Sequence, residues 1–142
     1  MPRYTGVLTI GRVLFAIAVC AFGVQVLLYG RFSAALGAGD ADAVVATFAP
    51  DGYYREAAGP QAVHRGTAEL RSFFAALFSA GGGVSLRPCV ITDDGVRCAI
   101  EYNCVRWGGR ELPPQAGLCV CERGPDGLLA AVREYDDLEP PA

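Results

Sequence analysis

The longest apolar run of the chain lies near its start, where the eighteen residues from Val13 to Gly30 carry no charge. As a helix this run would be about 27 Å long, just enough to cross the hydrocarbon core of a bilayer. Arg12 and Arg31 bracket it, and the arginine bias weakly favours an N-terminus on the inside. Three interpretations stay open: a membrane anchor, a helix buried against protein, and a signal peptide cleaved near Ser33. The protein would be membrane-associated if residues 13–30 span, and cytoplasmic otherwise.

Helical patterns follow this run. Gly39 and Asp40 end a first helix, with Asp40 as the N-cap of a short helix from Ala41 to Phe48. A longer helix runs from Thr67 to Ser79, and its apolar residues recur at the helical period on one face. Those residues are Leu70, Phe73, Phe74 and Leu77.

Strand patterns occupy most of the remainder, separated by Asp-Gly and Gly-Gly turns typical of hairpins. A first strand covers Tyr53–Ala57, and the segment that follows it to Gly66 is expected to be a loop. The later strands are Val84–Ile91, Val96–Trp107, Gln115–Glu122 and Leu128–Leu138. Helices first and antiparallel strands after them predict an α+β domain. A curved sheet wrapped over one long helix leaves a space suited to a small apolar ligand.

The composition bears on three features: nucleic-acid binding, metal sites and disulfides. Twelve basic and fifteen acidic residues are interspersed, so the clustered positive charge that nucleic acid requires is missing, and no nucleic-acid partner is expected. The six cysteines form no C-x-x-C pair and there is one histidine, so we predict no metal site. Cys20 lies in the apolar run, which leaves five cysteines in the domain. An odd number favours reduced, buried thiols over a disulfide framework.

Three segments in order carry a family resemblance: residues 35–52, residues 64–74 and residues 124–137. Together they resemble SnoaL-like domains of the nuclear transport factor 2-like fold, which implies a cone-shaped, mostly antiparallel sheet over helices. The division expected is an N-terminal helix at 1–30, the domain at 31–138 and a tail at 139–142. The N-terminal run also weakly resembles the first membrane helix of DoxX-like proteins.

The resemblance also suggests roles for residues. Steroid isomerases of the family carry a carboxylate base at the end of the first strand, and counting from Gly39 places it on Glu56. Their oxyanion-donor tyrosine falls on Phe32, which has no hydroxyl, and their second acid falls near Leu118 or Cys119. Steroid-type isomerisation is therefore not expected. Cyclase-like members place an acid on the last strand, where Asp136 or Asp137 stands.

The candidate catalytic residues are accordingly Glu56, His64 and Asp136. The candidate ligand-binding residues are Tyr54, Phe73, Phe74, Glu101, Asn103, Trp107 and Tyr135. Plainer alternatives exist for several: Glu56 as a solvated residue at the strand end, His64 in a loop or cap, the phenylalanines in the core, and Glu101 on a solvated outer face paired with Arg97 or with a neighbouring strand.

Two functions follow. The first is an enzyme without a cofactor, performing cyclisation, isomerisation or hydration on a small apolar, carbonyl-bearing metabolite. The second is a module that binds an apolar ligand or dimerises without turnover. We expect a homodimer in either case. The discriminating feature is whether Glu56 lies within reach of His64 or Asp136.

Overall fold

The computed structural model describes residues 27–57 and 62–136. Its helices are a first helix at 27–38, α2 (Ala41–Val45) and α3 (Gly66–Leu77). Its strands are β1 (Phe48–Arg55), β2 (Val63–Arg65), β3 (Val84–Asp93), β4 (Arg97–Trp107), β5 (Arg110–Arg123) and β6 (Leu129–Asp136). The predicted first part of the apolar run and the predicted tail lie outside the described residues.

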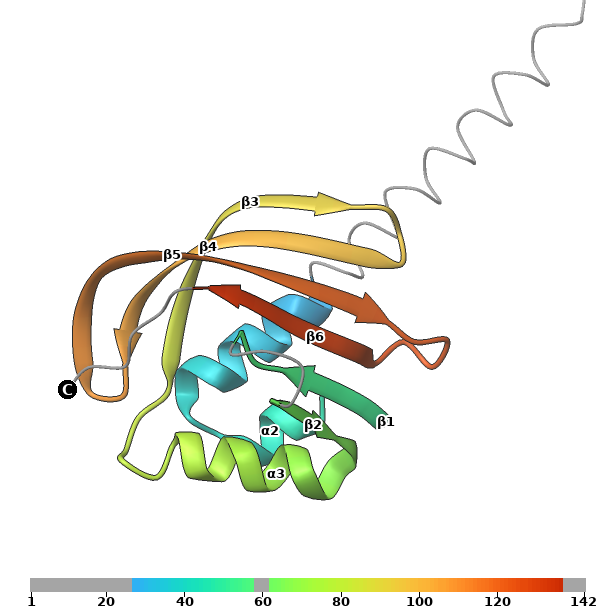
Figure 1. Cartoon of the computed structure of the whole chain (residues 1–142), viewed down its shortest axis with the longest axis horizontal. Helices are drawn as coiled ribbons and strands as arrows, with labels where there is room; N and C mark the ends of the chain where they lie inside the picture. The colour runs from blue at the N-terminus through green and yellow to red at the C-terminus, as the bar shows by residue number, and fades with distance from the viewer. Residues whose placement is uncertain (1–26, 58–61, 137–142) are drawn as a thin grey trace, which may run out of the picture.

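The six described strands form one sheet in the order β2-β1-β6-β5-β4-β3. Every neighbouring pair is antiparallel except β1 and β6, which run parallel. Figure 1 shows the long strands β3, β4 and β5 arching over the helices, which all lie on the concave side. We call the concave side the inner face and the convex side the outer face. The predicted α+β class with a curved, mostly antiparallel sheet is confirmed.

The core lies between the first helix, α3 and the inner face. Phe32 and Phe74 are fully buried and meet edge-to-face with ring centroids 6.4 Å apart, and Phe48 packs against both. Leu28 and Tyr29 are buried in the same cluster. The end of the apolar run therefore packs on protein, and the predicted boundary after residue 30 passes through the first helix. In residues 27–57 and 62–136 no helix is long and apolar enough to span a membrane.

Two differences from the predicted elements trace to strand pairing. The helix from Ala41 ends at Val45, because Phe48 already pairs with Leu129 of β6. The expected loop before Gly66 contains β2, which pairs with β1. The local sequence pattern could not show these differences. The early end of the helix depends on β6, which is distant in sequence, and β2 is too short to have a pattern of its own.

Backbone contacts at Gly83 hold the first helix onto the sheet. A Cβ there would lie 2.0 Å from the carbonyl oxygen of Leu36 and 2.5 Å from the amide nitrogen of Gly39. Beside it, the Arg106 guanidinium donates to the carbonyl oxygen of Gly37 at 2.8 Å and to the Ser85 hydroxyl at 2.7 Å. The end of this helix is therefore fixed against β3 and β4.

Candidate functional site

The end of β1 brings the predicted acid and the chain's single histidine together. His64 of β2 lies opposite Tyr54 of β1, so the two side chains share a face of this strand pair. The Glu56 amide donates to the carbonyl oxygen of Ala62 at 2.9 Å and continues the hairpin. As a result His64 Nε2 lies 2.8 Å from Glu56 Oε1.

The ring of Phe73 on α3 supports this Glu56–His64 pair from one side. The His64 imidazole stacks on Phe73 with centroids 4.1 Å apart, and Phe73 stacks on Tyr54 at 5.1 Å. The side chains of His64 and Glu56 remain 26% and 38% exposed. The pair is thus held in place by packing while solvent and solutes can reach it. A carboxylate and an imidazole that share one proton can act as acid and base.

A second acid, Glu134 of β6, lies inside the cone. It is 5% exposed, and the buried Tyr102 hydroxyl of β4 donates to its Oε2 at 2.9 Å. Tyr102 reaches it by crossing Gly117, where a Cβ would come within 2.6 Å of the tyrosine ring. The sequence interpretation missed both residues, because it assigned the face of Tyr102 to packing and looked for an acid at the strand end. Alternation from the apolar Val132 would have indicated Glu134.

The two acids belong to neighbouring strands. In the parallel pair of β1 and β6, Arg55 lies opposite Arg133. Glu56 and Glu134 are the next residues after these partners, so their backbones leave the pair at the same end. One carboxyl is half-exposed beside an imidazole, and the other is buried beside a phenol. Two carboxyls in such different surroundings are suited to separate acid and base roles.

Tyr29 and the thiols complete the inner face. Burial raises the pKa of the Tyr29 phenol far above its ordinary value, and Cys119, Cys121 and Glu134 add to the effect while Ser33 opposes it. Burial also raises the pKa of Cys98 to about 12. The hydrogen bond with Cys121, 4.0 Å between sulfurs, raises the pKa of Cys119, and burial adds to this. These groups are neutral at physiological pH, so the thiols are poor nucleophiles.

The structure places the other predicted ligand residues elsewhere. Phe74 lies in the core, where its ring is fully buried against Phe32 and Phe48, and its ligand contact stays a prediction. Trp107 packs on the edge of the core at the far end of β4. Asp136 is the last residue of β6, and its side chain lies outside what the structure describes.

Three more of these residues lie on the outer face. Glu101 is exposed, Asn103 donates to the Cys89 sulfur at 3.1 Å, and the 48% exposed Tyr135 ring lies under the Arg55 guanidinium at 4.5 Å. Strand alternation grouped Glu101 with Asn103 correctly. The structure places both on the outer face, which was the alternative predicted for Glu101. They therefore do not line the inner face.

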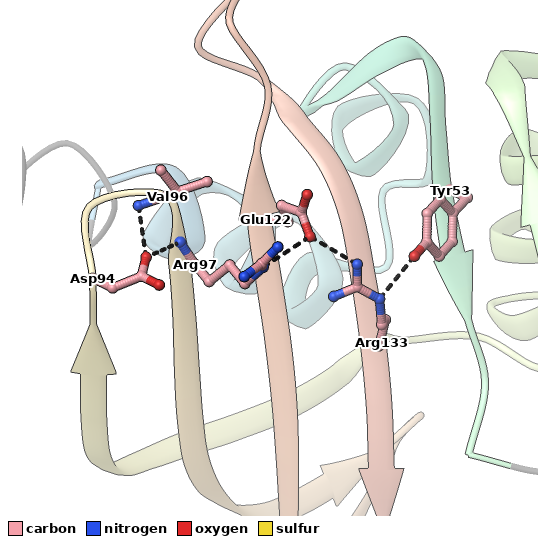
Figure 2. A network of polar contacts seen from close by, with 6 residues as sticks. All are labelled: Tyr53, Asp94, Val96, Arg97, Glu122 and Arg133. Atoms are coloured by element: carbon pink, nitrogen blue, oxygen red, sulfur yellow. Dashed lines mark hydrogen bonds and ion pairs between the residues drawn. The ribbon is translucent and has the colours of Figure 1, made fainter.

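The outer face instead carries a chain of polar contacts (Figure 2). Arg133 donates to the Tyr53 hydroxyl at 2.7 Å and to Glu122 at 2.8 Å, and Arg97 donates to the same Glu122 oxygen at 3.3 Å. Arg97 thus pairs with Glu122 and not with Glu101. The hydrogen bond from Arg133, with a smaller contribution from Arg97, lowers the pKa of Glu122.

The described part of the chain also places the possible metal ligands and the thiols. No group of three or more His, Cys, Asp or Glu side chains in residues 27–57 and 62–136 is arranged to hold a metal ion. The five cysteines of this part are free thiols, four buried and Cys89 exposed. The expected homodimer and the expected lack of a nucleic-acid partner stay predictions.

Comparisons with known proteins agree with this architecture. The family model of the SnoaL-like domain matches residues 29–132. No curated protein matches the sequence. Among solved structures, an LEH-like epoxide hydrolase of M. tuberculosis superposes with a TM-score of 0.67 at 21% identity, covering 81% of this chain and 84% of that one.

Two further structures show the same fold. A protein proposed to be a polyketide cyclase, from Xanthomonas campestris pv. campestris, gives a TM-score of 0.61 at 25% identity, with coverage of 82% and 90%. A nuclear transport factor 2-like protein of Anabaena variabilis gives 0.65 at 14% identity, with coverage of 84% and 90%.

Proposed function

The chain belongs to the SnoaL-like domain family, and on that premise we propose that it is an acid–base enzyme acting on a small, mainly apolar, carbonyl-bearing molecule without a cofactor. The observation that carries the proposal is the 2.8 Å contact between His64 Nε2 and Glu56 Oε1 on the inner side of β1 and β2. Similar folds include an epoxide hydrolase and a proposed polyketide cyclase, both of which are named for chemistry on oxygen-bearing molecules.

The pair supplies what proton transfer requires. One of the two groups accepts a proton from the carbon beside the carbonyl, and the electron pair moves onto the carbonyl oxygen. The resulting enolate then takes a proton back at the same or another carbon, which restores the pair. The Phe73 ring fixes the plane of the imidazole, so little reorientation is needed during transfer.

The test measures this proton transfer directly. The full-length protein is incubated with 2-tetralone in D₂O, and deuterium incorporation beside the carbonyl is followed by NMR. We expect exchange to be faster with the wild-type protein than in buffer. Glu56→Gln and His64→Asn keep the shapes of the two side chains and should each slow the catalysed exchange about 10²- to 10⁴-fold.

Glu101→Gln is the matched control, because it removes the same kind of charge from the outer face. It should leave the exchange rate unchanged. Equal rates for wild type and Glu56→Gln, with the ketone still bound, would refute the enzyme and support the alternative, a ligand-binding module without turnover.

A further inference from the structure

One hydroxyl on the inner face is buried without a hydrogen bond. Within residues 27–57 and 62–136, three buried side-chain atoms have no partner: the Tyr29 hydroxyl, Asp93 Oδ2 and Gln115 Oε1. Asp93 belongs to the β3–β4 turn, where its other oxygen accepts from the Gly95 amide at 2.6 Å. Tyr29 differs, because it is 4% exposed and lies deep in the core.

Its surroundings combine an apolar wall with a polar end. Tyr29 is on the buried side of the first helix, with its ring 6.5 Å from that of Phe32, one turn further on. Tyr29 shares the core cluster with Cys119 of β5 and Val132 of β6. Burial, with smaller contributions from Cys119 and Glu134, raises the pKa of its phenol. Ser33 is close enough to lower the pKa of the phenol, but among the described residues no group meets the distance and angle of a hydrogen bond to the Tyr29 oxygen. The Glu134–Tyr102 hydrogen bond lies on the same face.

A buried hydroxyl without a hydrogen-bond partner destabilises the folded state, so the presence of tyrosine at position 29 needs an explanation. Phenylalanine would fill the same volume without a polar atom, and the helix would lose no contact of the hydroxyl. A buried hydroxyl left without a partner destabilises a protein measurably, whereas one that meets a ligand recovers that cost on binding. The phenol is neutral, so it is available as a hydrogen-bond donor.

We propose that the Tyr29 hydroxyl is a specificity-determining donor that selects apolar ligands with an acceptor oxygen, such as ketones and ethers, and holds that oxygen beside Glu134 and Tyr102. The proposal rests on the proposed function only in taking the ligand to be small and apolar. It assigns the inner end of the site to the ligand oxygen and leaves the Glu56–His64 pair for proton transfer. No turnover is needed to test it.

The experiment compares two probes of nearly equal shape, acetophenone and ethylbenzene, of which only the first has an acceptor oxygen. Dissociation constants are measured by NMR titration of full-length wild type and Tyr29→Phe. The variant should weaken acetophenone binding about five- to tenfold and change ethylbenzene binding less than twofold. Its Tm should equal or exceed that of wild type, by up to about 6 °C, since the orphaned hydroxyl is gone.

Tyr53→Phe is the matched control, because its hydroxyl accepts from Arg133 on the outer face. It should leave both probe affinities unchanged. A lower Tm for Tyr29→Phe, an equal loss for both probes, no loss for acetophenone, or no binding of acetophenone to wild type would each overturn the proposal. Failure of the Glu56–His64 pair would appear in deuterium exchange instead, so the two failures are distinguishable.

Discussion

The two faces of strands β4, β5 and β6 use alternate residues of the same segments and treat polar groups differently. On the outer face, Tyr53, Arg133, Glu122 and Arg97 form a continuous chain of contacts that are partly open to water. On the inner face, Glu134 and Tyr102 are buried together, and Tyr29 has a hydroxyl without a partner. Outer groups that lose a contact can turn to solvent, whereas inner groups cannot. The polar groups of the inner face are therefore the ones whose presence a function must explain.

The largest effect should come from separating the first helix from the inner face. Gly83→Ala places a methyl group against the backbone of Leu36 and Gly39, which cannot move without lifting the helix end. We expect a loss of about 3 kcal/mol in the free energy of unfolding, measured by urea denaturation. Gly109→Ala, at a site with no atom within 4 Å, is the control and should change little. A mild effect at Gly83 would mean that the helix adjusts freely.

The next effect tests the buried acid. Tyr102→Phe removes the hydroxyl that donates to Glu134 and leaves the carboxyl with one fewer hydrogen bond in the core. The free energy of unfolding should fall by about 1–3 kcal/mol. Tyr53→Phe removes a hydroxyl on the outer face, where water can replace it, and should lower this energy by less than about 1 kcal/mol. Equal losses for the two variants would remove the contrast between the faces.

The elements of the fold could be predicted from the sequence, whereas the contacts of the inner face could not. The order of helices and strands followed from glycine and aspartate turns and from periodicity, which are local signals. Glu56 and His64 were each predicted, but their contact depends on β2, a strand of only three residues with no pattern of its own. Tyr29 was hidden for another reason: it lies in a run that is apolar on every face, so no periodicity marks its buried side.

Alternation along a strand showed which residues share a face, but it did not show which face is the inner one. It placed Glu101 and Asn103 on one face, yet only the position of the helices decides which face is the inner one. The same rule applied from the buried Val132 reaches Glu134, a charged residue two positions further on the same face. Its burial depends on Tyr102, which comes from a strand 32 residues earlier.

A smaller effect should appear as a pH dependence of stability on the outer face. The pKa of Glu122 is lowered in the folded protein, chiefly by the hydrogen bond from Arg133. The stabilisation that ionised Glu122 gives to the folded state is therefore fully present above its ordinary pKa of 4.5. It is lost as the pH falls through the lower pKa of the folded protein. Glu122→Gln should be less stable than wild type by about 1 kcal/mol at pH 7, and the difference should shrink below pH 4.5. Urea denaturation across this range measures it, and a difference independent of pH would contradict it.

The smallest effect should come from the exposed end of the same chain of contacts. Arg97 is 61% exposed, and its Nε lies 3.3 Å from a Glu122 oxygen that also accepts from Arg133. Arg97→Gln keeps part of the aliphatic stem and removes the charge, while Arg133 continues to pair with Glu122. We expect a loss of about 0.5 kcal/mol or less, and less still in high salt, because solvent screens an exposed pair. A loss of stability as large as that of Glu122→Gln would mean that the outer contacts act as one cooperative unit. The outer face would then be as sensitive to substitution as the buried inner face.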